Sequence, residues 1–312
     1  MPLDPHAKRL LERLAALNPP SARSLTVEER RSALEHLLSF TGTREEVAGV
    51  EQTLLAGAEA ELPARIYTPA GAAGKRLLPG IIFFHGGGLV AGSLDSHDGI
   101  CRSLANASAA RVISVGYRLA PEHPFPAALA DGYAAASAVC ARSGSFEVDP
   151  TRLVLCGDSA GATLAAVVCQ ANAATGQLRF ALQLLICPIM DFRAATASRR
   201  EFAHGYLLDQ ATLDHDLDHY LGTGGDPSDA RVSPARAAKV AGLPPTCIHT
   251  AQFDPLRDEG AAYAARLRRA GIPTTYRCHS GMIHLFYGMG RLIPYAATAY
   301  RLIGADIRAM LA

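Results

Sequence analysis

The chain has 312 residues, of which 49% are hydrophobic and 19% are charged, so it can form one large α/β domain with a substantial core. Its formal net charge is +1 and no long run of like charge occurs, which argues against nucleic acid or an anionic membrane surface as a partner. No apolar stretch approaches the roughly 18 residues of a membrane span, and charged residues interrupt any secretory signal at the start. We therefore expect a cytoplasmic protein without a membrane span.

The seven cysteines are scattered singly and form no C-x-x-C pair. This pattern predicts neither a disulfide framework nor a thiolate zinc site. We expect no metal and no cofactor.

Two helices are predicted at the start of the chain, before any strand. Residues 4–17 carry leucines along one helical face, and residues 26–29 form a capping box that opens a second helix through Leu38. Because both precede the first strand, we expect them to be an appendage to the main fold.

Strands and helices then alternate along the chain. Apolar runs predict strands at residues 51–55, 64–67, 81–84, 112–115, 153–156, 182–186, 246–250 and 275–278, and helices at about 97–108, 126–141, 160–173, 256–270 and 294–311. Such alternation is typical of an α/β fold with parallel strands and both sheet faces covered. The pattern stops between residues 190 and 239, and we expect this insertion to fold over the carboxyl ends of the strands, where α/β sheets bind ligands.

Residues 157–161 read Gly-Asp-Ser-Ala-Gly, between a predicted strand and a predicted helix. This G-x-S-x-G pattern is typical of the nucleophile elbow, in which a serine hydroxyl is exposed at a strained strand-to-helix turn. The glycines are needed because the backbones of strand and helix pass close to each other there. The alternative is a glycine-containing turn with an incidental serine. The first interpretation makes Ser159 the nucleophile.

A serine nucleophile needs a base, and the base needs an orienting acid, in the chain order Ser, Asp, His for this kind of elbow. Asp254 follows a predicted strand and is the candidate acid, whereas Asp258 and Glu259 are interpreted as first-turn acids of the next helix. Two histidines follow the last predicted strand. His284 lies deeper in the loop and is the favoured base, and His279, directly at the strand end, is the alternative.

A run of three glycines follows His85, directly after the predicted strand 81–84. Its position matches the HGGG-type loop that supplies oxyanion-hole amides together with the residue after the nucleophile. We expect the amides of Gly86, Gly87 and Ala160 to form the oxyanion hole, with His85 as a hydrogen-bonding brace of the loop.

Four stretches together resemble one known family. Residues 85–88, 117–128, 157–161 and 254–260 are similar to the motifs of hormone-sensitive-lipase-like carboxylesterases of the α/β-hydrolase superfamily, and the similarity spans about residues 45–310. It implies an α/β-hydrolase domain over residues 1–312, with an eight-stranded, mostly parallel sheet and a helical cap from about residues 1–45 and 190–239.

The resemblance also implies an activity and a site. These are hydrolysis of short- to medium-chain acyl esters through an acyl-enzyme, with Ser159, Asp254 and His284 as the triad and without a metal. A homodimer is compatible with it. An amidase or peptidase using the same triad, or a non-catalytic small-molecule receptor on this fold, is the alternative.

Two further features concern ligands. The position after the glycine run, often aromatic in the family, is Leu89, which we expect to shape the substrate pocket. His215 and His219 are spaced so that they can hold a metal on one helix face, but a solvated, charged cap helix explains them better.

Overall fold

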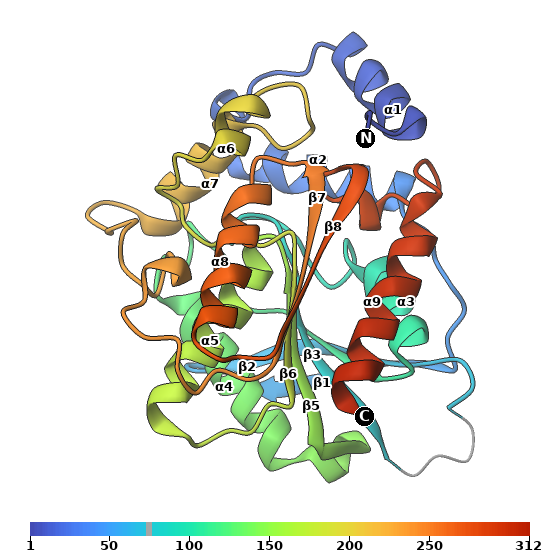
Figure 1. Ribbon diagram of the computed structural model, residues 1–312, viewed down its shortest axis with the longest axis vertical. Coiled ribbons are helices and arrows are strands. Elements are labelled where there is room, and N and C mark those ends of the chain that lie inside the picture. Colours follow the sequence, from blue (N-terminus) through green and yellow to red (C-terminus); the bar gives the residue numbers. More distant parts are fainter. Residues whose placement is uncertain (73–76) are drawn as a thin grey trace.

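One eight-stranded sheet forms the centre of the molecule in the computed structural model, which describes residues 1–72 and 77–312 (Figure 1). The strand order is β1-β2-β4-β3-β5-β6-β7-β8; β2 pairs antiparallel with β1 and β4, and the other neighbours are parallel. The expected α/β fold with a mostly parallel sheet is therefore confirmed. The strands are β1 (Gly49–Ala56), β2 (Glu61–Thr68), β3 (Leu78–Phe84), β4 (Arg111–Val115), β5 (Val148–Asp158), β6 (Leu182–Ile186), β7 (Thr246–Phe253) and β8 (Thr274–Ile283).

The central strands are apolar on both faces because helices cover both. In β3, Ile81 and Phe83 are buried in one core cluster, while Ile82 and Phe84 are buried in the other. One face carries α3 (Asp98–Ser108) and α9 (Tyr295–Leu311), and the other carries α4 (Ala127–Ala141), α5 (Ala160–Thr175) and α8 (Arg257–Arg269) (Figure 1).

No helix in the described ranges is both long and apolar enough to span a bilayer.

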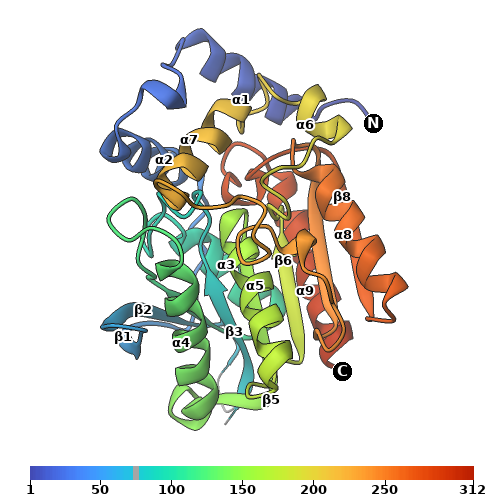
Figure 2. The ribbon, with the colours of Figure 1, turned by 90° about the vertical axis from the view of Figure 1, so that its left-hand side faces the viewer.

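The remaining helices gather across one end of the sheet (Figures 1 and 2). The Asp4 carboxylate caps the first of them by accepting hydrogen bonds from the amides of His6 and Ala7. The second begins with the predicted capping box of Thr26 and Glu29. We call these elements together the cap: α1 (Pro5–Ala16), a 3-10 turn (Ala22–Ser24), α2 (Val27–Thr41), α6 (Ala197–Glu201) and α7 (Gln210–Leu221). Further 3-10 turns are Ser143–Phe146, Pro234–Arg236 and Phe286–Gly288.

Candidate active site

Ser159 lies at a sharp bend between β5 and α5. Its φ of 53° and ψ of −122° are a backbone conformation that a residue other than glycine adopts only when its surroundings impose it. A side chain at Gly157 would collide with the backbone of Gly161, and one at Gly161 would collide with the carbonyl of Phe84. The bend therefore requires glycine on both sides, and it places the serine hydroxyl at the N-terminus of α5.

Ser159, His284 and Asp254 meet at the carboxyl ends of the parallel strands β5, β8 and β7. His284 Nε2 lies 3.1 Å from Ser159 Oγ, and His284 Nδ1 lies 2.8 Å from Asp254 Oδ2. Asp254 Oδ1 accepts a hydrogen bond from the Leu256 amide at 2.8 Å, and all three polar residues are less than one-tenth exposed. The sulfur of Cys187 lies within 4.8 Å of the ligand atoms of Asp254 and His284, but these two already hydrogen-bond each other. The arrangement can activate a serine hydroxyl by removing its proton.

His279, the alternative base, is directed elsewhere. Its Nε2 lies 3.1 Å from Nδ1 of His249, and its Nδ1 lies 3.2 Å from the Tyr295 hydroxyl. Burial, together with the charge of Arg277, lowers the pKa of His279 to about 4, so its ring is neutral at pH 7. The structure thus joins Ser159 to His284 and not to His279.

The glycine loop after β3 brings amides beside Ser159, though not the pair expected. The Gly86 amide donates to Asp158 Oδ1 at 2.9 Å and is therefore already engaged, so the structure contradicts the expected oxyanion role of Gly86. Gly87 and Gly88 line the cavity next to Ser159, and their amides have no hydrogen-bond partner within the described chain. Together with the Ala160 amide at the start of α5, they are the donors available at this site.

His85 lies beneath the glycine loop. Its ring stacks on that of Tyr117 with centroids 4.4 Å apart, and the Tyr117 hydroxyl donates to the His85 carbonyl oxygen at 2.7 Å. Burial, together with nearby His97, lowers the pKa of His85 to about 4. A neutral, stacked ring fits the bracing role that the sequence suggested.

Sequence reasoning missed Asp158, the buried carboxylate beside the nucleophile. Besides the Gly86 amide, it accepts the Tyr287 hydroxyl at 3.0 Å, and His97 lies 3.5 Å away. Burial acts to raise the pKa of Asp158, but His97 and the Tyr287 hydrogen bond outweigh it and hold this pKa below its usual range. Asp158 thereby ties the glycine loop to the nucleophile bend. The position of Asp158 inside the G-x-S-x-G pentapeptide was the sequence signal that could have indicated its role in the site.

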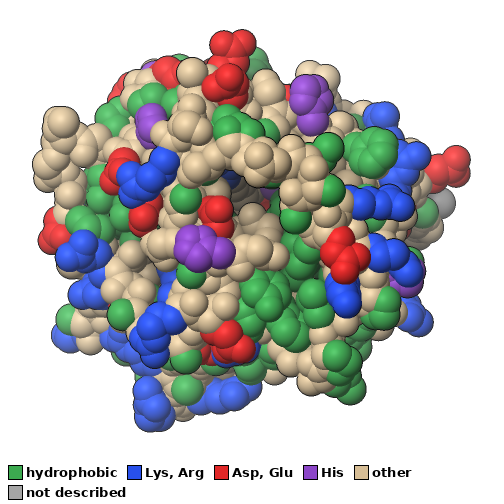
Figure 3. All heavy atoms as spheres, turned by 90° about the horizontal axis from the view of Figure 1, so that it is seen from above, with side chains coloured by type: hydrophobic (Ala, Val, Ile, Leu, Met, Phe, Trp, Pro, Cys, Tyr) green, Lys and Arg blue, Asp and Glu red, His purple; other side chains and the backbone are tan. Residues whose placement is uncertain are grey.

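A cavity of about 440 Å³ opens above Ser159, between the sheet and the cap. On the outer surface of the cap side, charged side chains of both signs are scattered (Figure 3). The prediction that Leu89 shapes the pocket is wrong: Leu89 is buried in the core, with a φ of 65° in the turn that follows the glycines. The cap consists of two segments, the first running from α1 to α2 and the second from α6 to α7. The cavity wall is mostly leucine from both cap segments: Leu11, Leu14, Leu25, Leu34, Leu37, Leu207, Leu208 and Leu213, with Ile189 and Phe192.

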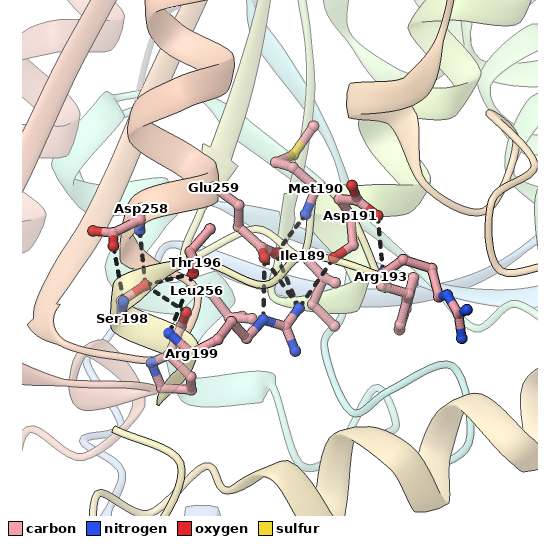
Figure 4. Close-up of polar contacts among 12 residues, drawn as sticks. Ile189, Met190, Asp191, Arg193, Thr196, Ser198, Arg199, Leu256, Asp258 and Glu259 are labelled. Carbon is pink, nitrogen blue, oxygen red and sulfur yellow. Dashed lines mark hydrogen bonds and ion pairs between the residues drawn. The ribbon is translucent and has the colours of Figure 1, made fainter. Parts of the chain in front are cut away.

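A buried ion pair fixes the start of the second cap segment to α8 (Figure 4). Arg199 of α6 donates to Glu259 Oε2 through Nε at 3.1 Å and Nη2 at 3.0 Å, and Glu259 Oε1 accepts the Met190 amide at 2.9 Å. Beside it, Asp258 Oδ2 accepts the Ser198 amide at 2.8 Å (Figure 4). Asp258 and Glu259 do lie in the first turn of α8, but they also anchor the cap, which the sequence did not indicate.

The two histidines suspected of binding a metal lie on α7, one turn apart. His219 Nδ1 hydrogen-bonds the His215 carbonyl oxygen at 2.8 Å, and His215 Nδ1 lies 3.1 Å from Asp216 Oδ1. His215 and Asp216 are each only 4% exposed. The expectation of a solvated helix face is therefore wrong for these two residues, which point into the protein.

Comparison with known proteins places this chain in a family. Residues 81–288 match the family profile described as alpha/beta hydrolase fold. The carboxylic ester hydrolase LipN of Mycobacterium tuberculosis is 42% identical over 244 residues, which are 76% of this chain and 64% of LipN, so the chain spans slightly less than two thirds of that relative. Carboxylesterase NlhH of the same organism is 35% identical over 277 residues, 88% of this chain and 86% of NlhH. The structure of an ester hydrolase from the metagenome of Lake Arreo has a TM-score of 0.95 at 42% identity, covering 98% of both chains.

The fold, the bent serine and these similarities define a serine hydrolase of the carboxylic ester class. The chain belongs to the α/β-hydrolase family, in its hormone-sensitive-lipase-like branch.

Proposed function

We propose that this protein hydrolyses carboxylic esters of short to medium acyl chain length, with Ser159 as nucleophile, His284 as general base and Asp254 as orienting acid. The observation that carries the proposal is the continuous chain of contacts from Asp254 through His284 to the Ser159 hydroxyl, at 2.8 and 3.1 Å. The leucine-lined cavity above the serine supports an apolar substrate. Its volume of about 440 Å³ falls at the small end for ligand pockets, in keeping with a modest acyl chain.

The reaction proceeds in two acyl transfers. His284 Nε2 takes the hydroxyl proton as Ser159 Oγ attacks the ester carbonyl, and Asp254 stabilises the imidazolium that forms. His284 then protonates the departing alcohol oxygen. Water repeats the sequence on the acyl-enzyme and releases the acid, with His284 again as base and then acid.

The negative oxygen of each tetrahedral intermediate needs fixed donors. We assign the amides of Gly87, Gly88 and Ala160 to this role, replacing Gly86, because Gly86 donates to Asp158. Asp158 keeps the loop in register with the nucleophile, since one carboxylate contacts Gly86 and lies next to Ser159 in the chain.

Replacing the nucleophile tests the proposal. Ser159→Ala should lose at least about 1000-fold in kcat on p-nitrophenyl butyrate, because removing a triad member leaves only the contribution of binding and the oxyanion donors. A fluorophosphonate probe should label Ser159 in the unmodified protein, and intact-mass measurement would check it. Ser280→Ala, at an exposed serine of β8, is the matched control and should keep full activity.

Retained hydrolysis by a folded Ser159→Ala variant would contradict the proposal. Failure of the probe to label Ser159 would favour a receptor, and faster cleavage of a matched nitroanilide than of the nitrophenyl ester would favour an amidase. The single domain over residues 1–312, the cytoplasmic location and the homodimer stay predictions.

A further inference from the structure

A buried charge cluster joins the two cap segments directly above the glycine loop. Arg30 of α2 donates to Asp216 of α7 through Nε to Oδ1 at 3.2 Å and through Nη2 to Oδ2 at 2.8 Å. His215 Nδ1 lies 3.1 Å from the same Oδ1. The side chain of Arg30 is 13% exposed and that of Asp216 is 6% exposed, so the pair is almost fully removed from water. Removing both charges from water costs desolvation free energy, and a buried ion pair does not by itself show that the fold is stabilised. The position of this pair therefore calls for another explanation.

The side chain of Asp216, on α7, occupies the space beside Gly88, which belongs to the glycine loop. A Cβ atom added to Gly88 would overlap the Cβ, Cγ and Oδ2 atoms of Asp216. Gly88 also has a φ of +70°, so only glycine fits this position both conformationally and sterically. The Asp216 side chain therefore packs against the backbone of a loop residue whose amide the proposed mechanism uses. Arg30, Asp216, Gly87 and Gly88 all line the same cavity.

A second ion-pair group joins the same parts of the chain without reaching the loop. Arg23, in the 3-10 turn before α2, lies 3.0 Å from Asp214 Oδ2 and 3.5 Å from Asp218 Oδ2, both on α7. The side chains of these residues are 55%, 37% and 67% exposed, so the contacts are screened by water and contribute little to stability. The Arg23 group is therefore an internal control: it also links the N-terminal segment to α7, but at the surface.

We infer that Asp216, held by Arg30, is a positioning residue that fixes Gly88 in the glycine loop for oxyanion binding. The inference rests on the proposed function, in which the Gly88 amide is an oxyanion donor. Three consecutive glycines have much backbone freedom, and donors stabilise a transition state only when they are fixed in advance. Asp158 fixes one end of the loop through Gly86, and Asp216 fixes the other end by packing against Gly88.

The ion pair has an electrostatic consequence as well. An unpaired carboxylate beside Gly88 would oppose the negative charge that develops on the substrate oxygen. Arg30 cancels that charge with a bidentate contact. The cap therefore contributes to the stability of the transition state as well as to the shape of the cavity.

Matched methionine substitutions test this inference. Arg30→Met removes the guanidinium above the loop, and Arg23→Met removes the one at the surface. We expect Arg30→Met to lower kcat by about 10-fold or more while KM changes by less than about threefold, because a misplaced oxyanion donor costs somewhat less than the 100-fold or more of a deleted one. Arg23→Met should leave both constants unchanged. The double variant Arg30→Met with Asp216→Asn should recover part of the lost kcat, because it removes the carboxylate charge that Arg30 no longer offsets, while His215 stays in both variants.

Two readouts separate positioning from general loss of structure. Titration of Ser159 with a fluorophosphonate gives kcat per active site, so unfolded protein does not contribute. Affinity for a trifluoromethyl ketone, which forms a tetrahedral adduct, should fall in parallel with kcat/KM across the variants. KM itself should change little.

The inference is overturned if kcat per titrated site in Arg30→Met stays within about twofold of the unmodified protein, or if Arg23→Met loses as much. A double variant as slow as Arg30→Met would overturn the electrostatic part. These results are distinguishable from failure of the proposed function, which would appear as activity in Ser159→Ala.

Discussion

Two adjacent residues, Asp158 and Ser159, divide the work of the site. Ser159 presents its hydroxyl to His284, while the buried carboxylate of Asp158 holds the Gly86 amide and the Tyr287 hydroxyl. Because they are neighbours in the chain, the residue that holds the start of the glycine loop is bonded directly to the nucleophile. The nucleophile and the proposed oxyanion donors are thus kept in fixed relation by one short stretch of backbone.

The two histidines near the end of β8 can be told apart by matched substitutions. His284→Gln should lower kcat by about 1000-fold or more, because glutamine cannot take up the serine proton. His279→Gln should lower it by less than about tenfold, because an amide can retain contacts with His249 and Tyr295 and the ring is neutral at pH 7. Steady-state hydrolysis of a nitrophenyl ester at pH 7.5 would measure both. A larger loss from His279→Gln than from His284→Gln would reverse the assignment.

At the scale of elements, the features that the sequence predicted are those with local signals. The eight strands follow from short apolar runs, and Asp254 and His284 could be chosen because each comes after a strand end. Contacts between distant segments have no such signal. The side chain of Glu259 meets Arg199, 60 residues away, and Gly86 meets Asp158, 72 residues away. The anchoring of the cap and the oxyanion role of Gly86 were therefore missed or misjudged.

The buried pair of Arg199 and Glu259 should make the attachment of α6 dependent on pH. Burial raises the pKa of Glu259 from 4.5 to about 7, against the opposing charge of Arg199. Between pH 4.5 and about 7, the folded protein therefore keeps a proton on Glu259 that the unfolded chain has released. The contribution of Glu259 to stability consequently falls as the pH rises through this range. Above it, the ionised Glu259 depends on Arg199.

Arg199→Met should consequently destabilise the protein more at pH 8 than at pH 5. We expect a loss of roughly 3–5 kcal/mol at pH 8, as for other buried charges left without a partner, and a smaller loss at pH 5, where Glu259 is protonated. Urea unfolding at both values would measure the difference. Arg200→Met, at the exposed arginine next to it, is the control and should cost little at either pH. An equal loss at pH 5 and pH 8 would contradict the argument.

At the scale of the whole molecule, the cavity is an assembly of three parts of the chain. The sheet edge supplies Ser159 and His284, while two cap segments more than 150 residues apart supply the leucine wall. The N-terminal helices, which the family resemblance had assigned to the cap, therefore contribute directly to the proposed binding site. The preference of the enzyme for substrates of a given acyl chain length should consequently change on substitutions in α1, which is far in sequence from the reacting groups.

Leu14 of α1 lines the cavity, whereas Leu17, at the end of the same helix, is 76% exposed and does not. Leu14→Ala removes apolar contact with the far part of a longer acyl chain, at about 0.8 kcal/mol for each methylene that loses its contact. We expect kcat/KM for p-nitrophenyl hexanoate and octanoate to fall by about 3- to 10-fold, while the value for the acetate, which lacks these methylenes, stays the same. Leu17→Ala should leave the whole series unchanged. An equal fall for acetate and octanoate in Leu14→Ala would show that α1 acts on the reacting groups and not on the acyl chain.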